Sequence, residues 1–526
     1  MKKKAVIFSL FFGTIMLTSL AAGALLQNKP LESENSETTI TNTPADNFPD
    51  EQRAQFCGSG IPKSTPFVKE YSIPTACTNP LAIVADYEGN VWFAQTNTGK
   101  LAKFDPISES FTEFDNPLWP KNGRSMIWGM DYSPDGSLWF TDESYDSIWK
   151  FSIEDKKYQR IAYPSEGNAL PQKIKVEGSQ IIINDFSGNK ITFLDPTQTD
   201  NALKYLNLPS PVPGSVTSAF AVDTQNNLWY TNWILEKGGV LVKFDQDGYR
   251  NSLSKSKGNS IPDTDYIKIF QLPAELLTPN GLAIYDDGMI WIADTSSSTI
   301  FNFDPTSETF TPYVTSTPKL STYGNLTGVI KSPISRPYWI AINPDNNLVF
   351  NEQTANSIGI MNPKSESLVE YLIPSKNPSW GDCLDTSDCG VAQIFDFTMH
   401  GDKIWFTEWV ENNIGVIDTS IPIPFEIQLD SNSISLAAGE SKQIFFVISP
   451  KQSVTDMSLV LSDSSNFLNL TSNESTPFTL DADSSKTVNV TISASSEILP
   501  GTYKVLVGAQ IEDVSSSKFV TVTILP

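Results

Sequence analysis

A short unit of two apolar strands, with a polar residue where the first strand ends, recurs along this chain and constrains its fold more than any other feature. The last copy reads WFTEWVENNIGVID and begins at Trp405. The seven copies begin at Trp92, Trp139, Ile182, Trp229, Trp291, Val349 and Trp405. Their spacing of 43 to 62 residues is typical of the four-stranded blades of a β-propeller. The repeat therefore predicts an all-β fold built as a seven-bladed β-propeller.

Each copy extends into a four-stranded unit. An apolar strand and an Asp-Gly or Asn-Asn turn precede it, as in MDYSPDGSLW at residues 130–139, and such turns are typical of hairpins. A fourth strand, often closed by proline, follows every copy except the seventh. Residues 67–74, FVKEYSIP, have the same pattern without a blade of their own. We expect them to form the outer strand of blade seven and close the ring, which removes open sheet edges; the alternative is that they cap blade one independently.

The chain divides into four regions. Residues 1–27 combine three lysines with an uncharged apolar run, which predicts either a signal peptide or an uncleaved membrane anchor. Residues 28–66 are expected to be a disordered linker and lead-in, because they are rich in Ser, Thr, Asn and acids. Residues 67–420 hold the propeller. Residues 424–526 lack Trp and Cys and alternate apolar with polar residues, which predicts an immunoglobulin-like β-sandwich that serves as a spacer or adhesion module.

The N-terminal segment predicts an extracellular protein, either secreted or anchored to the cell membrane, and the cysteine content fits that location. The chain carries 36 Lys+Arg against 60 Asp+Glu, a net charge of −24, so a phosphate backbone would repel it and non-specific nucleic-acid binding is excluded. The four cysteines are Cys57, Cys77, Cys383 and Cys389. Three disulfide pairings are open, although Cys383 and Cys389 bracket a short loop. Sequons compatible with glycosylation lie at Asn325, Asn469, Asn473 and Asn489.

Polar residues end the second strand of each predicted blade. Because the first two strands form a hairpin, these residues are expected at one mouth of the ring. The acids are Asp142, Asp185, Asp294, Glu352 and Glu408, and they are joined by Gln95, Asn232 and Asn280. Converging oxygen ligands suit Ca²⁺ or Mg²⁺, so one interpretation is a metal site of Asp142, Asp185, Asn280, Asp294, Glu352 and Glu408. The other is that these groups cap strand ends and bind water. We expect the Glu408 carboxylate to point toward the ring axis alongside Glu352 and Asp294.

Aromatic residues at the same mouth are candidates for ligand binding. Long inserts at 246–264, 313–335 and 375–391 open there, and long loops are often functional. The candidate ligand-binding residues are Trp128, Asn232, Trp233, Tyr338 and Trp409. The alternative is that the tryptophans, including Trp380, pack beneath the inserts. His400, the only histidine, lies in a hairpin turn at the opposite end and is expected to be an exposed turn residue rather than a base.

The inner strand, the Asp-Gly turn, IWFTE and NxIGxID together resemble the virginiamycin B lyase family, the streptogramin lyases, over residues 67–420. The resemblance implies a seven-bladed propeller that eliminates across an ester bond of streptogramin B antibiotics with Mg²⁺, using a histidine and a nearby glutamate. Glu352 and Glu408 match that glutamate. The positions matching the family's histidines hold Leu81, Trp128, Gln172, Ser218, Asn280 and Tyr338, with Gln393 or Ile394 in blade seven. An elimination needs a base near neutral pKa, and no residue here matches that histidine.

A second, local resemblance links PNGLAIYDDGMIWIAD, residues 279–294, to the SMP-30/gluconolactonase family, which implies a divalent metal at Asn280. We expect an extracellular, lyase-like propeller that binds a ligand or a cation at the cell surface, its partner being a small molecule or a surface polymer. The alternative is an enzyme, either a divalent-metal-dependent lyase of the streptogramin B type or a lactonase of the SMP-30 type.

Overall fold

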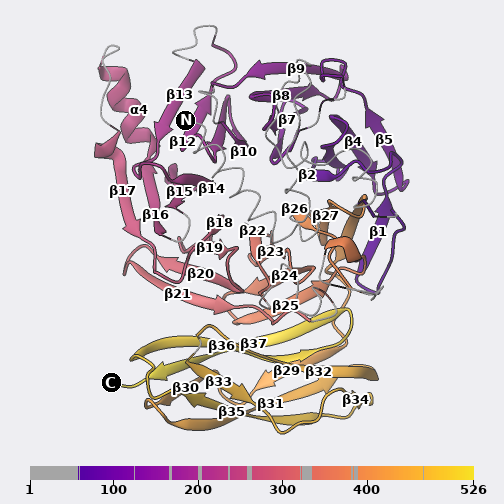
Figure 1. The fold of residues 1–526 in the computed structure, drawn as a ribbon, viewed down its shortest axis with the longest axis vertical. Helices are drawn as coiled ribbons and strands as arrows, with labels where there is room; N and C mark the ends of the chain where they lie inside the picture. Colours follow the sequence, from indigo (N-terminus) through magenta and orange to yellow (C-terminus); the bar gives the residue numbers. More distant parts are fainter. Residues whose placement is uncertain are drawn as a thin grey trace, which may run out of the picture.

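The computed structural model describes residues 57–526, apart from 59, 122, 124, 165–168, 199–203, 235–236, 257–262, 320–321, 323–333, 381–382, 384–388 and 466. The predicted export segment, most of the predicted linker, the Asn325 sequon and parts of the three inserts lie outside the described residues. The described chain is all-β. Its antiparallel sheets are arranged in a ring, as in a β-propeller, and a second β module lies against one side (Figure 1). Within the described ranges, no helix is long and apolar enough to cross a membrane.

The ring contains seven groups of four antiparallel strands among the described residues. Sheet 1 is β2 (Pro80–Ala85), β3 (Val91–Gln95), β4 (Lys100–Asp105) and β5 (Ser110–Phe114). Sheet 2 is β6 (Met130–Ser133), β7 (Ser137–Asp142), β8 (Ser147–Ser152) and β9 (Lys157–Ala162). Sheet 3 is β10 (Pro171–Glu177), β11 (Gln180–Asp185), β12 (Lys190–Leu194) and β13 (Tyr205–Pro209). Sheet 4 is β14 (Val216–Val222), β15 (Asn227–Ile234), β16 (Gly238–Asp245) and β17 (Ile267–Gln271).

The remaining three groups follow the same plan. Sheet 5 is β18 (Pro279–Ile284), β19 (Ile290–Asp294), β20 (Thr299–Asp304) and β21 (Thr309–Val314). Sheet 6 is β22 (Pro337–Ile342), β23 (Leu348–Glu352), β24 (Ser357–Asn362) and β25 (Ser367–Leu372). Sheet 7 is β26 (Ile394–His400), β27 (Lys403–Glu408), β28 (Asn413–Asp418) and β1 (Val68–Ser72).

Local sequence explains these sheets. The first and second strands of sheets 2 and 5 are joined by Asp-Gly turns in which Gly136 and Gly288 adopt φ values of 75° and 87°, a conformation that glycine reaches without steric cost. The second strands are buried along their whole length in sheets 1, 2, 5 and 6, as expected for short continuous apolar runs. Outer strands such as β9 are mostly exposed. The core therefore lies between the faces of neighbouring sheets, near their second and third strands.

The chain closes the ring by pairing its two ends. Strand β1 pairs antiparallel with β28, from Val68 opposite Ile417 to Ser72 opposite Asn413. This confirms the prediction that the segment around residues 67–74 is the outer strand of the last sheet. Nearby, the backbone N–H of Gly58 donates to the carbonyl of Val410 at 2.6 Å.

The C-terminal module consists of two packed sheets. Their strands are β29 (Phe425–Leu429), β30 (Ser433–Leu436), β31 (Ser441–Pro450), β32 (Val454–Asp463), β33 (Leu468–Thr471), β34 (Phe478–Leu480), β35 (Lys486–Ala494), β36 (Gly501–Gln510) and β37 (Val514–Ile524). One sheet has the order β29-β31-β35-β33 and the other contains β37-β36-β32-β34, with β30 parallel to β37. Alternate residues such as Phe446, Ile448, Val488 and Val490 fill the shared core.

This module is joined to the ring by a continuous sheet. Strand β25, the outer strand of sheet 6, pairs antiparallel with β37, from Ser367 opposite Lys518 to Tyr371 opposite Val514. Figure 1 shows β36 and β37 directly beneath β25. The C-terminal module therefore covers the outer edge of sheet 6, an arrangement that the sequence did not predict.

Short helices and disulfides complete the described structure. The first insert forms helix α4 (Gln246–Lys255), and the Asp245 side chain caps it by accepting from the N–H of Gly248. Single 3₁₀ turns lie at η3 (Thr264–Tyr266) and η4 (Pro378–Trp380). Disulfides join Cys57 to Cys77 and Cys383 to Cys389, which resolves the pairing that the sequence left open.

Candidate functional site

Side chains from sheets 2, 3, 6 and 7 contact one another in the ring, in part between sheets that are not adjacent. The ring of Trp128, just before sheet 2, lies 5.8 Å from that of Phe395 on β26, and Phe395 lies 6.2 Å from Tyr338 on β22. The Gln172 side chain on β10 donates from Nε2 to Tyr338 Oη at 3.3 Å. All four side chains are buried. Three of them stand where the family resemblance places histidines, and these positions are filled by mutual packing.

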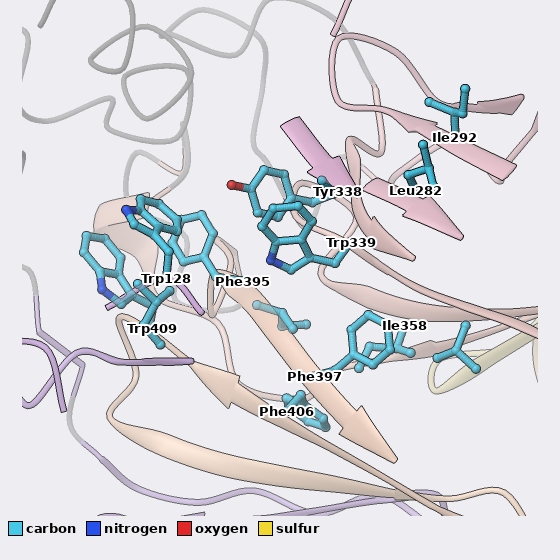
Figure 2. Packing of buried hydrophobic residues seen from close by; sticks show 14 of the residues in the cluster. Trp128, Leu282, Ile292, Tyr338, Trp339, Ile358, Phe395, Phe397, Phe406 and Trp409 are labelled. Carbon is cyan, nitrogen blue, oxygen red and sulfur yellow. The ribbon is translucent and has the colours of Figure 1, made fainter. Parts of the chain in front are cut away.

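Aromatic packing continues into the third insert. Trp409, which follows β27, lies 5.5 Å from Phe395, and Trp380 of η4 lies 5.4 Å from Trp409. We call Trp128, Tyr338, Trp339, Trp380, Phe395 and Trp409 the aromatic cluster; Figure 2 shows most of its rings gathered together. The predicted residues Trp128, Tyr338 and Trp409 thus meet at one place and are buried, and their role in ligand binding stays a prediction. Among the described residues, the indole N–H of Trp409 and the amide oxygen of Gln393 are buried and have no hydrogen-bond partner.

Phe395 was missed by the sequence analysis, which assigned the matching position to Gln393 or Ile394. Pro337 pairs with Glu352 in sheet 6, and Tyr338 follows it. In sheet 7 Ile394 pairs with Glu408, so the equivalent of Tyr338 is Phe395. The first strands of both sheets carry the same register irregularity. The hairpin of sheet 7 is one residue shorter, because Ala341 pairs with Val349 whereas Thr398 pairs with Trp405, and this difference shifts the match by one residue. Aligning the two sheets on the residue directly opposite the strand-end glutamate would have identified Phe395.

The other predicted inner-strand residues form a separate polar contact. Ser218 Oγ lies 3.3 Å from Asn280 Oδ1 and also accepts from Trp233 Nε1 at 2.7 Å. Asn280 Nδ2 donates to Thr295 Oγ1 at 2.9 Å. Trp233 packs against Phe186, with 6.0 Å between ring centroids. Asn280 and Trp233 are thus brought together through Ser218.

An ion pair links two inner strands next to these groups. Lys173 Nζ on β10 lies 3.3 Å from Asp396 Oδ1 on β26 and 4.2 Å from the centre of the Trp339 ring. The other oxygen of Asp396 accepts from the N–H of Ile83 at 3.2 Å. Burial raises the pKa of Asp396, and the Lys173 charge opposes that shift. Sequence reasoning missed this pair because neither residue stands at the end of a strand.

The strand-end aspartates are buried and bonded within their own surroundings. Asp142 accepts from Ser125 Oγ at 2.5 Å and from Trp149 Nε1 at 2.8 Å, and burial raises its pKa to about 6. Asp185 accepts from the N–H groups of Leu170 and Gly188, both at 2.8 Å. Burial raises the pKa of Asp185 as well.

Each of these aspartates also interacts with a cation. Arg160 lowers the pKa of Asp142, and Lys190 Nζ lies 3.7 Å from Asp185. In sheet 5, Asp294 accepts from the N–H of Thr278 at 2.8 Å and interacts electrostatically with Arg336. Burial raises the pKa of Asp294. The negative charge of each aspartate is thus balanced inside its own part of the ring.

The two strand-end glutamates have a different environment. Glu352 accepts from Ser357 Oγ on β24 at 2.8 Å, and Glu408 accepts from Asn413 Nδ2 on β28 at 3.1 Å. Their charged neighbours are other acids on the outer strands, Glu370 on β25 and Glu70 on β1. The carboxylates therefore point toward the outer strands. The expectation that Glu408 and Glu352 point toward the ring axis is wrong.

The pKa values of both glutamates are raised. Burial raises the pKa of Glu352 to about 8, and the charge of Glu370 adds to that shift. Burial, and then the charge and hydrogen bond of Glu70, raise the pKa of Glu408 well above its ordinary value. One oxygen of each, Glu352 Oε1 and Glu408 Oε1, is buried and accepts no hydrogen bond from the N–H and O–H groups of the described residues.

Within the described part of the chain, the acids among the six predicted metal ligands are not gathered around one point. Within the described ranges, no three His, Cys, Asp or Glu side chains are grouped so that they could hold a metal ion. Asn232, the strand-end residue of sheet 4, donates to Thr217 Oγ1 at 2.8 Å. The strand-end acids serve separate sheets, and a hard cation needs at least six oxygen ligands around one point.

The aromatic cluster contains no histidine. His400 pairs with Lys403 at the β26–β27 turn and is exposed, in agreement with its predicted position. It is the only histidine of the chain.

Comparisons with known proteins give the following relatives. Among solved structures, a streptogramin B lyase is 20% identical, with 66% of this chain and 96% of that chain covered and a TM-score of 0.49. A virginiamycin B lyase from Staphylococcus aureus is 19% identical, with coverage of 67% and 98% and a TM-score of 0.49. Regucalcin from Agrobacterium tumefaciens, a calcium-binding protein, is 11% identical, with coverage of 56% and 90% and a TM-score of 0.35. No curated protein matches the chain.

The family assignment rests on a different comparison. The model of the virginiamycin B lyase family matches residues 25–302. The matched segment is more than half of the 526 residues. The resemblance inferred from the strand repeat is thereby confirmed, and the chain belongs to the virginiamycin B lyase family.

Proposed function

We propose that this protein is a ligand-binding member of its family that does not open streptogramin B lactones. Its seven sheets are the blades of one closed seven-bladed propeller, and its C-terminal module is an immunoglobulin-like sandwich. The protein acts outside the cell, either secreted or held at the membrane by its N-terminal segment. Two disulfides support this location, because disulfides persist in oxidising compartments.

The packing of Trp128, Tyr338 and Phe395 against one another carries this proposal. An ester elimination needs a base that is unprotonated near neutral pH and lies within hydrogen-bond reach of the substrate. Here the positions that match the family's histidines hold buried side chains that contact each other. Glu352 and Glu408 face outer strands, so neither is directed toward the aromatic cluster.

The aromatic cluster supports binding of a small molecule or surface polymer that carries a flat ring or a sugar. Trp380 and Trp409 offer large apolar faces, and aromatic residues with a polar edge are typical of such sites. Trp409 Nε1 and Gln393 Oε1 have no partner within the described structure. A ligand with one acceptor and one donor would satisfy both.

One observation favours the enzyme alternative, a lyase or lactonase that works with Mg²⁺ or Ca²⁺. A carboxyl group whose pKa is about 8, such as Glu352, resembles the tuned acids of active sites. A metal-dependent mechanism would require this group to reorient, because its present partners are Ser357 and Glu370.

Incubation with a streptogramin B lactone distinguishes the two functions. The full chain is incubated with the lactone and Mg²⁺ or Ca²⁺, and the product is analysed by mass spectrometry. We expect the lactone to stay intact. Metal-dependent linearisation that is abolished by Glu408→Gln would establish the enzyme.

Binding is tested separately by tryptophan fluorescence during titration with the same lactone and with soluble oligosaccharides. We expect a saturable change with at least one probe, which Trp409→Ala removes. Tyr87→Ala, an aromatic residue that is 70% exposed in the β2–β3 turn, serves as the control and should bind normally. If no probe changes the fluorescence of the wild-type protein, the aromatic cluster is packing alone.

A further inference from the structure

The strand-end residue and an outer-strand acid lie on the same sheet face in three of the sheets. In each of these sheets, three paired residues form a row across the strands. A phenylalanine of the second strand, two residues before the strand end, pairs with a small residue of the third strand, and that small residue pairs with the acid of the outer strand. The rows are Phe93–Ala102–Glu113, Phe350–Gly359–Glu370 and Phe406–Gly415–Glu70. The strand-end residues are Gln95, Glu352 and Glu408. This shared register brings the two polar side chains of each sheet toward each other.

Sheet 1 shows that the end groups meet. Gln95 Nε2 donates to Glu113 Oε1 at 2.7 Å. Thr75 Oγ1 donates to the other oxygen at 2.6 Å, and Lys100 Nζ lies 3.7 Å away. Although burial opposes the shift, these contacts lower the pKa of Glu113. An amide and a cation thus balance the outer-strand carboxylate.

Sheets 6 and 7 have the same strand register as sheet 1, but other residues replace the amide and the cation that balance the outer-strand acid there. Glu352 and Glu408 replace the amide of Gln95, and Ser357 and Asn413 occupy the position of Lys100. Within the described part of the chain, no Lys or Arg side chain forms a hydrogen bond or ion pair with Glu352 or Glu408. The rings of Phe350 and Phe406 lie over the glycines, because a Cβ added at Gly359 or Gly415 would come within 2.3 or 2.1 Å of them. Each pair of acids is therefore buried beside an apolar wall.

We propose that each of these acid pairs, Glu352–Glu370 and Glu408–Glu70, shares one proton where sheet 1 has a cation. The shared proton stabilises the junction at which the pair lies, and loss of the proton destabilises that junction. Both pairs lie at junctions between distant parts of the chain. Glu70 belongs to β1, which closes the ring on β28. Glu370 belongs to β25 and accepts from Ser515 Oγ of the C-terminal module at 2.5 Å. Acids that the sequence suggested as metal ligands thus have a different role.

The hydrogen bonds indicate where each proton resides. Glu70 accepts from the N–H of Ser375 at 3.0 Å, from Ser375 Oγ at 2.6 Å and from the N–H of Lys63 at 2.7 Å. Glu370 accepts from the N–H of Ser316 at 2.9 Å and from Ser515. The outer-strand acids are surrounded by donors, which suits the anion. The oxygens of Glu352 and Glu408 that lack a donor carry the proton and can donate it to the neighbouring carboxylate.

Few other charged groups face the two pairs. In sheet 7, Glu411 of the β27–β28 turn adds negative charge near Glu408, and Lys63 of the lead-in acts on Glu411. In sheet 6, Glu352 also interacts with the hydroxyl groups of Thr315, Ser335 and Ser357. Loss of a proton would leave two adjacent buried anions at each junction.

The sign of the pH effect follows from proton binding. An acid whose pKa is raised in the folded state binds more protons there than in the unfolded chain, so stability falls as pH rises between the two values. For Glu352 this window extends from its ordinary value to about 8. Each shared proton makes the unfolding equilibrium constant rise about tenfold per pH unit within its window.

The test measures unfolding by urea from pH 5 to pH 9 on the full chain. Glu352→Gln and Glu408→Gln should each lower by one the number of protons released on unfolding, which the pH dependence of the unfolding free energy measures. Gln95 is the natural example of such a glutamine in sheet 1. Glu113→Gln, the matched control in sheet 1, should leave the alkaline slope unchanged. Unchanged slopes in both Gln variants would overturn the proposal.

Infrared spectroscopy of the wild-type protein gives a second readout that does not depend on a variant folding. We expect the carbonyl stretch of buried, protonated carboxylic acids at pH 7 and its loss at high pH. Its absence at pH 7 would also overturn the proposal. So would stabilisation at pH 8 by added Mg²⁺ or Ca²⁺ that Glu408→Gln abolishes, because a metal ion would then replace the proton.

Discussion

Lys173 and Asp396 form an ion pair, 3.3 Å from Nζ to Oδ1, between the inner strands of sheets 3 and 7. These sheets are not neighbours in the ring, so the pair joins distant parts of the inner wall. Asp396 is 4% exposed, and its other oxygen is bound by the backbone of Ile83. A buried carboxylate that loses its cation is strongly destabilised.

Lys173→Met is therefore expected to lower the free energy of unfolding by about 2 to 3 kcal/mol at neutral pH, somewhat below the range for a fully buried pair because Lys173 is partly exposed. Urea denaturation measures the change. Lys69→Met removes a comparable but exposed pair with Glu109 and should have no measurable effect. Equal effects of the two substitutions would show that the Lys173–Asp396 pair has no special structural role.

Phe395 is the ring that connects Trp128, Tyr338 and Trp409. Its replacement by alanine removes contacts with three aromatic neighbours and leaves a cavity, which costs about 3 to 5 kcal/mol for a buried phenylalanine. We expect Phe395→Ala to lower the urea midpoint by a corresponding amount. Ile107→Ala, at a side chain that is 95% exposed, is the control. A small effect of Phe395→Ala would mean that the cluster is loosely packed and open to a ligand.

The strand repeat predicted the order of the strands and the pairing of the two chain ends, because hairpin turns and apolar runs are local signals. The repeat could not predict the direction in which the strand-end side chains point. Glu408 stands at the predicted position, but whether its carboxylate faces the axis or the outer strands depends on which outer-strand residue lies beside it. Glu70, more than 300 residues away in sequence, occupies that place.

Phe395 and the β25–β37 pairing were missed for different reasons. The hairpin between β26 and β27 is one residue shorter than that between β22 and β23, which shifts Phe395 by one residue relative to a count along the sequence. The outer edge of β25 carries the same alternating pattern whether it faces solvent or another strand, so no local signal shows that β37 covers it. The β25–β37 pairing thus depends on a contact between residues that are distant in sequence.

The β25–β37 pairing predicts the behaviour of the ring without its C-terminal module. A chain that ends after residue 421 would expose the edge of β25, and Phe519 would no longer pack against Tyr313, with which it has a centroid distance of 5.0 Å. Exposed edges pair with other chains. We expect the truncated protein to dimerise or aggregate, as measured by size-exclusion chromatography with light scattering. Adding Val369→Lys on β25 should restore monomers; a monomeric truncated chain without it would contradict this expectation.

The two disulfides should differ in their contribution to stability. Cys57–Cys77 spans 20 residues that include β1, whereas Cys383–Cys389 spans 6. Since a cross-link restricts the unfolded chain more when its loop is longer, the first should contribute about 3 kcal/mol and the second about 2 kcal/mol. Urea unfolding of Cys57→Ser/Cys77→Ser and Cys383→Ser/Cys389→Ser variants measures both. The first variant should also show faster amide hydrogen exchange in β1, because this loop holds the closing strand; exchange that rises equally across all sheets would argue against a local role in ring closure.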